Sequence, residues 1–181
     1  ENLYFLTGAV NFYNSNIDIS NLNLKNSMAE DGINFVNSSV KLKNIKINDT
    51  ISDAIDFDFS NGKVENIVAS NIKGDALDFS GSNFEISNSN FRNIFDKAIS
   101  VGERSNINID NIKVKNSDIG IAVKDGSFTN LRKYYFLENK NDISAYLKKP
   151  FYEKGGKINI YGGSKSLTIY SDELSEIKFY D

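Results

Sequence analysis

Apolar and polar positions repeat along most of the chain with a period of about 22 residues. Six segments share one pattern, with a small residue in the second position, an aliphatic residue in the third, and Phe or Val in the fifth. These segments begin at Gly8, Asp31, Asp53, Asp75, Lys97 and Ile119. The fourth position is polar in all but the last segment. Such alternation is typical of a β-strand with one buried face, so we expect the third and fifth positions to face inward and the fourth outward.

Each unit contains two further pairs of apolar residues, such as Ile17 and Ile19 followed by Leu22 and Leu24. These pairs predict two more short strands per unit, separated by polar corners that asparagine fills in two columns. The columns are Asn21, Asn44, Asn66, Asn88 and Asn111, and Asn26, Asn48, Asn71, Asn93 and Asn116. Asparagine tolerates the left-handed backbone region, and its amide can bond to neighbouring groups. We therefore expect ladders of stacked asparagines at the bends.

Three strands per unit with asparagine at the bends predict an all-β fold, a parallel β-helix solenoid with 22-residue rungs. The chain resembles the right-handed parallel β-helix (pectate-lyase-like) repeats of large bacterial secreted and surface proteins in the strings DAIDFDF, GDALDFSGS, DKAISVGERS and IGIAVKDGS. The resemblance covers residues 8–127 and implies a right-handed coil. This fold hosts lyases, hydrolases, epimerases, adhesins and inert stalks, so it leaves the activity open.

The chain divides into three parts. Residues 1–6 begin with ENLYF, the stem of a common engineered protease site, and are interpreted as a tag remnant. Residues 7–127 hold the β-helix rungs. Residues 128–181 leave the repeat and predict one last distorted rung and a C-terminal β cap, with strands at 158–161, 167–170 and 177–180. Nothing before Gly8 resembles an amphipathic cap, so we expect the chain to be part of a larger protein.

Composition narrows the chemistry that is available to the chain. Its 181 residues include 26 Asn and 22 Ile but no Cys, His or Trp. This excludes thiol and imidazole catalysis, zinc fingers, disulfides and a Ser-His-Asp triad. The formal net charge is −3 and there are only three Arg, so we expect no nucleic-acid partner. No apolar run approaches the ~20 residues that span a bilayer, so we expect no membrane insertion.

Charged residues gather on the expected outward stripe between residues 53 and 125. Asp56 and Asp78 occupy the fourth position on adjacent rungs, which places their Cα atoms ~5 Å apart. Asp58 follows on the same face. The next bend holds Glu103, Arg104, Lys124 and Asp125. Stacked like charges destabilise each other, so the stripe predicts a bound cation, a shared proton or a compensating lysine.

Two enzymatic interpretations fit this stripe. A glycoside hydrolase needs two carboxyl groups, about 5–5.5 Å apart for retention or wider for inversion, and Asp56, Asp58 and Asp78 supply such pairs. A polysaccharide lyase needs its uronate substrate neutralised, commonly by Ca²⁺ or Arg, and a base that removes a proton. For the lyase, the predicted Ca²⁺ ligands are Asp56, Asp78 and Glu103, and the candidate bases are Lys97, Arg104 and Lys124. The predicted ligand-binding residues are Asp58, Glu103 and Asp125.

The third interpretation is structural, with Asp31, Asp53 and Asp75 capping the corner backbone at strand starts and lysines neutralising them. We therefore expect a non-catalytic β-helix module of a secreted or cell-surface bacterial protein, which binds polysaccharide or another surface component or acts as a spacer or adhesion element. The alternative is a polysaccharide lyase or glycoside hydrolase that uses the outward Asp, Glu and Lys residues. Ca²⁺ is the one cofactor that these interpretations introduce.

Overall fold

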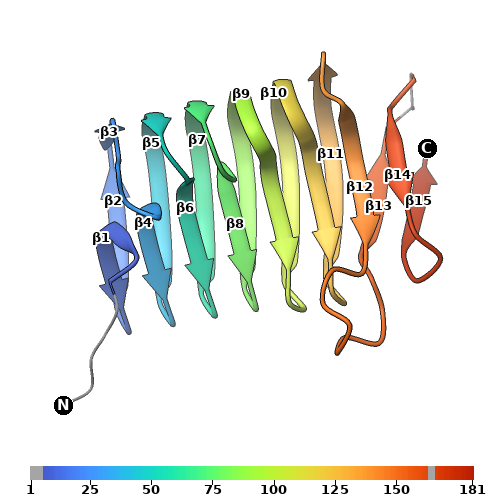
Figure 1. Cartoon of the computed structure of the whole chain (residues 1–181), viewed down its shortest axis with the longest axis horizontal. Helices are drawn as coiled ribbons and strands as arrows, with labels where there is room; N and C mark the ends of the chain where they lie inside the picture. Colours follow the sequence, from blue (N-terminus) through green and yellow to red (C-terminus); the bar gives the residue numbers. More distant parts are fainter. Residues whose placement is uncertain (1–5, 163–165) are drawn as a thin grey trace.

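The computed structural model describes residues 6–162 and 166–181, so that residues 1–5, most of the expected tag remnant, lie outside the described part. All regular structure in the described part is β-strand. The strands are β1 (Gly8–Tyr13), β2 (Asn16–Ser20), β3 (Asn23–Lys25), β4 (Asp31–Val36), β5 (Ser39–Thr50), β6 (Asp53–Asp58), β7 (Asn61–Ile72), β8 (Leu77–Ser80), β9 (Asn83–Gly102), β10 (Asn106–Lys124), β11 (Phe128–Leu137), β12 (Asn141–Tyr146), β13 (Lys157–Tyr161), β14 (Ile169–Ser171) and β15 (Glu176–Tyr180). They form a parallel β-solenoid of about 8 turns, which advances along the long axis of the molecule (Figure 1).

One side of the solenoid, which we call the first sheet, is built from the strands that begin each repeating unit. It runs β1–β4–β6–β8 and continues through the ends of β9 and β10 to β12 and β14. The remaining sides contain β2, β3, β5, β7, β11, β13, β15 and the earlier parts of β9 and β10. Every one of these pairings is parallel, and the repeat columns of the sequence are the register partners.

The second and third predicted strands of a unit are separate only in the first turn, as β2 and β3. In later turns they merge into single bent strands, the 12-residue β5 and β7. In β9 and β10 the strand continues through the next corner into the first sheet. A left-handed residue at a bend changes the direction of the backbone without ending its pairing to the neighbouring turn, so the corners do not interrupt the strands.

The core contains the apolar columns that the repeat predicts. Phe35, Phe57 and Phe79 are fully buried and stack ring on ring, with centroids 5.3 Å and 4.7 Å apart. Phe12 extends the stack at 5.1 Å from Phe35. Identical rings lie above one another because the parallel register places the fifth position of each unit beside that of the next turn. The prediction that positions three and five face inward is confirmed from the second segment to the sixth, whereas in the first segment Val10 is 39% exposed.

Asparagine ladders are present at the bends. The predicted corner asparagines other than Asn48 have φ between 52° and 64°, in the left-handed region. Their amides bond across turns, as from Asn66 Nδ2 to Asn44 Oδ1 at 2.7 Å. Asn48 is an exception because the bend of its turn lies one residue later, where Asp49 has a φ of 62° and accepts the bond from Asn71.

Residues 128–181 lose the sequence repeat but keep the coil. β11, β13 and β15 stack in turn on β10, and β12 and β14 extend the first sheet. The segment predicted as a cap is therefore made of further, less regular parallel turns. No helix in the described residues could span a membrane.

Candidate functional site

The outer surface of the first sheet carries the charged residues that the repeat aligns, and we call it the charged face. It comprises Asp31, Asn34, Asp53, Asp56, Asp58, Asp75, Asp78, Lys97, Ser100 and Lys124. The first and fourth positions of a unit share this face, as the 3.4 Å hydrogen bond from Asn34 Nδ2 to Asp31 Oδ2 illustrates. Because positions three and five are committed to the core, the fourth position faces away from it. Asn34, Ser100 and Ala122 at this position are nevertheless buried, whereas Asp56 and Asp78 are half-buried.

Asp56 and Asp78 are register partners on β6 and β8, as the spacing predicts. Among the described residues, neither carboxyl group accepts a hydrogen bond. Burial, followed by repulsion from Asp58 and Asp78, raises the pKa of Asp56 to about 9. Burial and the charges of Asp78 and Glu103 raise the pKa of Asp58 to about 6. At neutral pH Asp56 is therefore an uncharged carboxyl group, which can donate as well as accept a hydrogen bond.

Asp53 and Asp75 cap the corner backbone of the next turn, as the structural interpretation expects. Asp53 Oδ1 accepts the backbone N–H of Asp75 at 2.7 Å, and Asp75 Oδ1 accepts that of Lys97 at 2.9 Å. Burial raises the pKa of Asp53 to about 7, although the bond from Asp75 opposes the shift. Each of these side chains therefore already has a structural contact.

Lys97 and Lys124, two of the three predicted bases, have different environments. Lys97 Nζ contacts Asp75 at 3.1 Å and Asp96 at 2.6 Å. Burial alone would lower the pKa of Lys97, but the two carboxylates outweigh it and hold the pKa above its usual value. Lys124 is only 5% exposed and donates from Nζ to Ser100 Oγ at 2.7 Å. Burial lowers the pKa of Lys124 against the opposing attraction of Asp78 and Asp75, so Lys124 has the environment of a base and Lys97 does not.

The carboxylates that come together for a cation differ from the predicted set. One oxygen each from Asp53, Asp75 and Asp78 lie within 4.8 Å of one another, and carboxylate oxygens are the ligands that Ca²⁺ prefers. Asp78 was predicted, whereas Asp53 and Asp75 come from the column of strand starts. That column was visible in the sequence, but it was interpreted only as capping the corner backbone, which Asp53 and Asp75 also do. Calcium at this cluster would compete with Lys97 for Asp75.

Glu103, Arg104 and Asp125 lie at the bend beyond the charged face and contact the loop between β12 and β13. Asp125 is 1% exposed, and its Oδ1 accepts the backbone N–H groups of Lys148 and Lys149 at 2.7 Å and 2.8 Å. Two further contacts reach the same loop. Glu103 pairs with the Lys149 ammonium, and the Arg104 guanidinium lies 5.4 Å from the centre of the Tyr152 ring. Sequence reasoning missed these contacts because the loop lies outside the repeat.

The coil and its surface define the class of the protein. It is a parallel β-solenoid with asparagine ladders and a charged lateral face. No model of a protein family, no curated protein and no solved structure matches the chain.

Proposed function

We propose that the chain is a non-catalytic β-solenoid module of a secreted or cell-surface bacterial protein, which binds polysaccharide or another surface component through its charged face. A solenoid offers a long lateral surface whose groups recur at ~4.8 Å from turn to turn, which suits an extended polymer. Carboxyl groups that lack protein partners offer hydrogen bonds to the hydroxyl groups of such a polymer.

The observation that carries this proposal is how the charged side chains are used. Lys97 is paired with two carboxylates, Asp75 and Asp125 receive backbone N–H groups, and Glu103 is paired with Lys149. Lys97 and Glu103, which a lyase would use, are thus engaged in holding the fold. Asp56, Asp58 and Asp78 remain; they lie adjacent on two turns and are half-buried.

The test is binding and turnover on one panel of neutral and acidic polysaccharides, each with calcium and with chelator. We expect retention of at least one glycan, no change in its chain length, and loss of retention in Asp78→Asn. Asp18→Asn on β2 removes the same charge from an exposed position of another side and serves as the matched control. Cleavage of any glycan that depends on Asp78 would refute the non-catalytic proposal.

A polysaccharide lyase or glycoside hydrolase is the second candidate, because one observation favours it. Lys124, with its lowered pKa, and Asp56, with its raised pKa, lie on the same face, and groups shifted in this way are common at catalytic sites. In a lyase, Lys124 would remove the proton and Asp56 would donate one. Formation of unsaturated uronide ends by the wild type, and their loss in Lys124→Met, would support this candidate over the first.

A further inference from the structure

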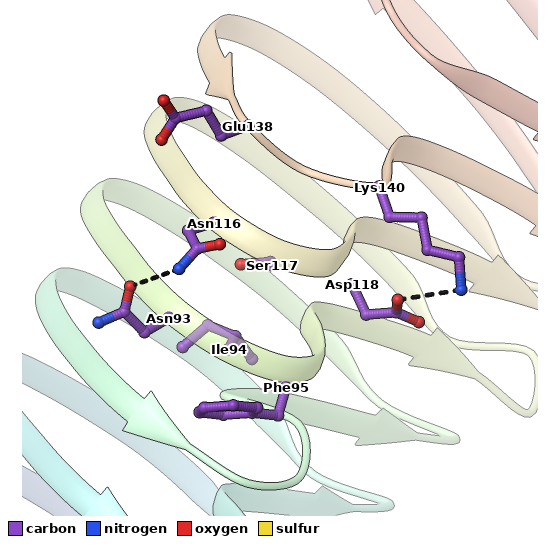
Figure 2. A pocket seen from close by; sticks show the side chains of 8 residues that line it. All are labelled: Asn93, Ile94, Phe95, Asn116, Ser117, Asp118, Glu138 and Lys140. Carbon is purple, nitrogen blue, oxygen red and sulfur yellow. Dashed lines mark hydrogen bonds and ion pairs between the residues drawn. The ribbon is translucent and has the colours of Figure 1, made fainter.

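A groove follows the corner of the solenoid that precedes the first sheet; we call it the corner groove. One wall is formed by Asp49, Asn71, Asn93, Asn116 and Glu138, and the other by Ile51, Lys73, Phe95, Asp118 and Lys140. It contains two hollows of about 350 Å³ and about 310 Å³, and Phe95 lines both of them. Figure 2 shows the second hollow, with Phe95 on one turn and Asn116, Ser117 and Asp118 on the next.

The first wall is an asparagine ladder with unused hydrogen-bonding capacity. Asn71 donates to Asp49, Asn93 to Asn71, and Asn116 to Asn93, each at 2.9 Å. Each bond uses one N–H of an amide that has two, and one lone pair of an oxygen that has two. Asn71 and Asn116 are exposed and Asn93 is half-buried, so equivalent donors and acceptors recur from turn to turn, ~4.8 Å apart.

The second wall supplies an apolar platform in the middle of the groove. Phe95 is 58% exposed, although large apolar side chains of this repeat are otherwise placed mainly in the core. The Lys73 ammonium, from the preceding turn, lies 3.6 Å from the centre of the ring. The next turn carries Asp118 and the turn after it carries Lys140, and both residues line the second hollow together with Phe95 (Figure 2).

The charges along the second hollow are paired within the protein. Lys140 Nζ lies 3.2 Å from Asp118 Oδ1, and Lys115 Nζ lies 3.3 Å from Glu138 Oε2. In this hollow an anionic or cationic ligand would compete with one of these partners. The groove therefore combines polar groups, an aromatic ring and balanced charge, which fits an uncharged ligand rich in hydroxyl groups.

We propose that the corner groove binds an extended neutral glycan along the solenoid axis, with one pyranose ring on Phe95. The spacing of the amides is close to the length of one ring in an extended β-1,4-linked chain. Each successive sugar would therefore lie beside the ladder asparagine of the next turn. Each hollow is near the lower end of small-molecule pockets, roughly 300–1,000 Å³, which is room for one ring. This inference goes beyond the function proposed above, because it concerns another surface and holds even if the charged face binds nothing.

The experiment is calorimetric titration of the whole chain with cellohexaose, with retardation in gels that contain hydroxyethylcellulose as a second readout. We expect Phe95→Ala to weaken binding at least tenfold and Phe95→Tyr to retain it. Phe151→Ala is the matched control, since Phe151 is a 74% exposed phenylalanine on the loop between β12 and β13. Melting temperatures of all variants show whether they are folded.

Four outcomes are informative. Binding that is lost in Phe95→Ala and kept in Phe151→Ala and Asp78→Asn supports the inference. Binding that Asp78→Asn abolishes and Phe95→Ala leaves intact overturns it, while supporting a glycan site on the charged face. Absence of wild-type binding to both glucans also overturns it. A dimer that depends on Phe95, seen by sedimentation without glucan binding, would show that the groove contacts a second copy of the chain instead.

Discussion

The carboxyl groups of the charged face predict that the protein loses stability as the pH rises through the neutral range. Asp56 has a pKa of about 9 in the folded chain, against ~3.9 for an unperturbed aspartate. Between these values the folded state keeps a proton that the unfolded chain has released. A carboxyl group whose pKa is raised by folding stabilises the folded state most on the acidic side, and that contribution is lost as the pH rises.

The magnitude follows from one linked proton. Each pH unit lowers the free energy of unfolding by about 1.4 kcal/mol per proton, so Asp56 alone accounts for about 3 kcal/mol between pH 5 and pH 7. For a domain of this length that is roughly 6–12 °C in melting temperature. Asp53, with a pKa of about 7, and Asp58, with a pKa of about 6, act in the same direction. No histidine in the chain titrates in this range to mask the effect.

The assay is thermal unfolding followed by circular dichroism from pH 5 to pH 7.5, at constant ionic strength and with a chelator present. Asp56→Asn keeps the size of the protonated side chain. We expect this variant to show a flatter pH dependence, and its free energy of unfolding at pH 7 to exceed that of the wild type by up to about 4 kcal/mol. Asp18→Asn, at an exposed position of β2, is the control and should keep the wild-type slope. A wild-type melting temperature that is constant or rises over this range would refute the reasoning.

Three further changes test the fold. Phe57→Ala removes the middle ring of the buried stack and should cost about 3–5 kcal/mol in denaturant unfolding, whereas a loss under 1 kcal/mol would contradict the stacked core. Asn71→Ala breaks two ladder bonds and places alanine at a φ of 57°, so it should lower the free energy of unfolding by about 2–4 kcal/mol. Asn71→Gly should recover about 1–2 kcal/mol of this loss, because glycine adopts a positive φ without strain. Equal losses in the two variants would exclude backbone strain. Asp125→Ala should speed tryptic cleavage after Lys148, because its carboxylate holds the N–H groups of Lys148 and Lys149; an unchanged digestion rate would contradict that role.

The columns of the solenoid could be predicted from the sequence because each one repeats a single environment. Ile33, Ile55 and Leu77 are aligned at the same position of the repeat, and all three are fully buried. A parallel coil gives each turn the same neighbours above and below, so a residue type that suits one turn suits the next. Six copies of the pattern therefore predicted the inward positions, the bends and the ladder.

The contacts of long side chains could not be predicted in this way. Lys97 and Asp96 are adjacent in the chain, where alternation would place them on opposite faces, yet the ammonium contacts the Asp96 carboxylate because the strand bends at the corner. Lys124 reaches back over one whole turn to Ser100. The corner groove was not predicted either. It lies between two columns of the repeat, and the sequence pattern of each column does not indicate the width of the space between them.

The distribution of charge in the fourth column supports a ligand for the charged face. Asp56 and Asp78 lie between neutral residues of the same column, Asn34 on the preceding turn and Ser100 on the following one. Asparagine has nearly the same volume as aspartate, so a column that served only the fold could avoid the cost of burying two adjacent ionisable groups. Sites that violate a local rule at a cost in stability are where function is expected. We expect the double variant Asp56→Asn with Asp78→Asn to melt at a higher temperature than the wild type at pH 7, and to lose the glycan retention proposed for the charged face.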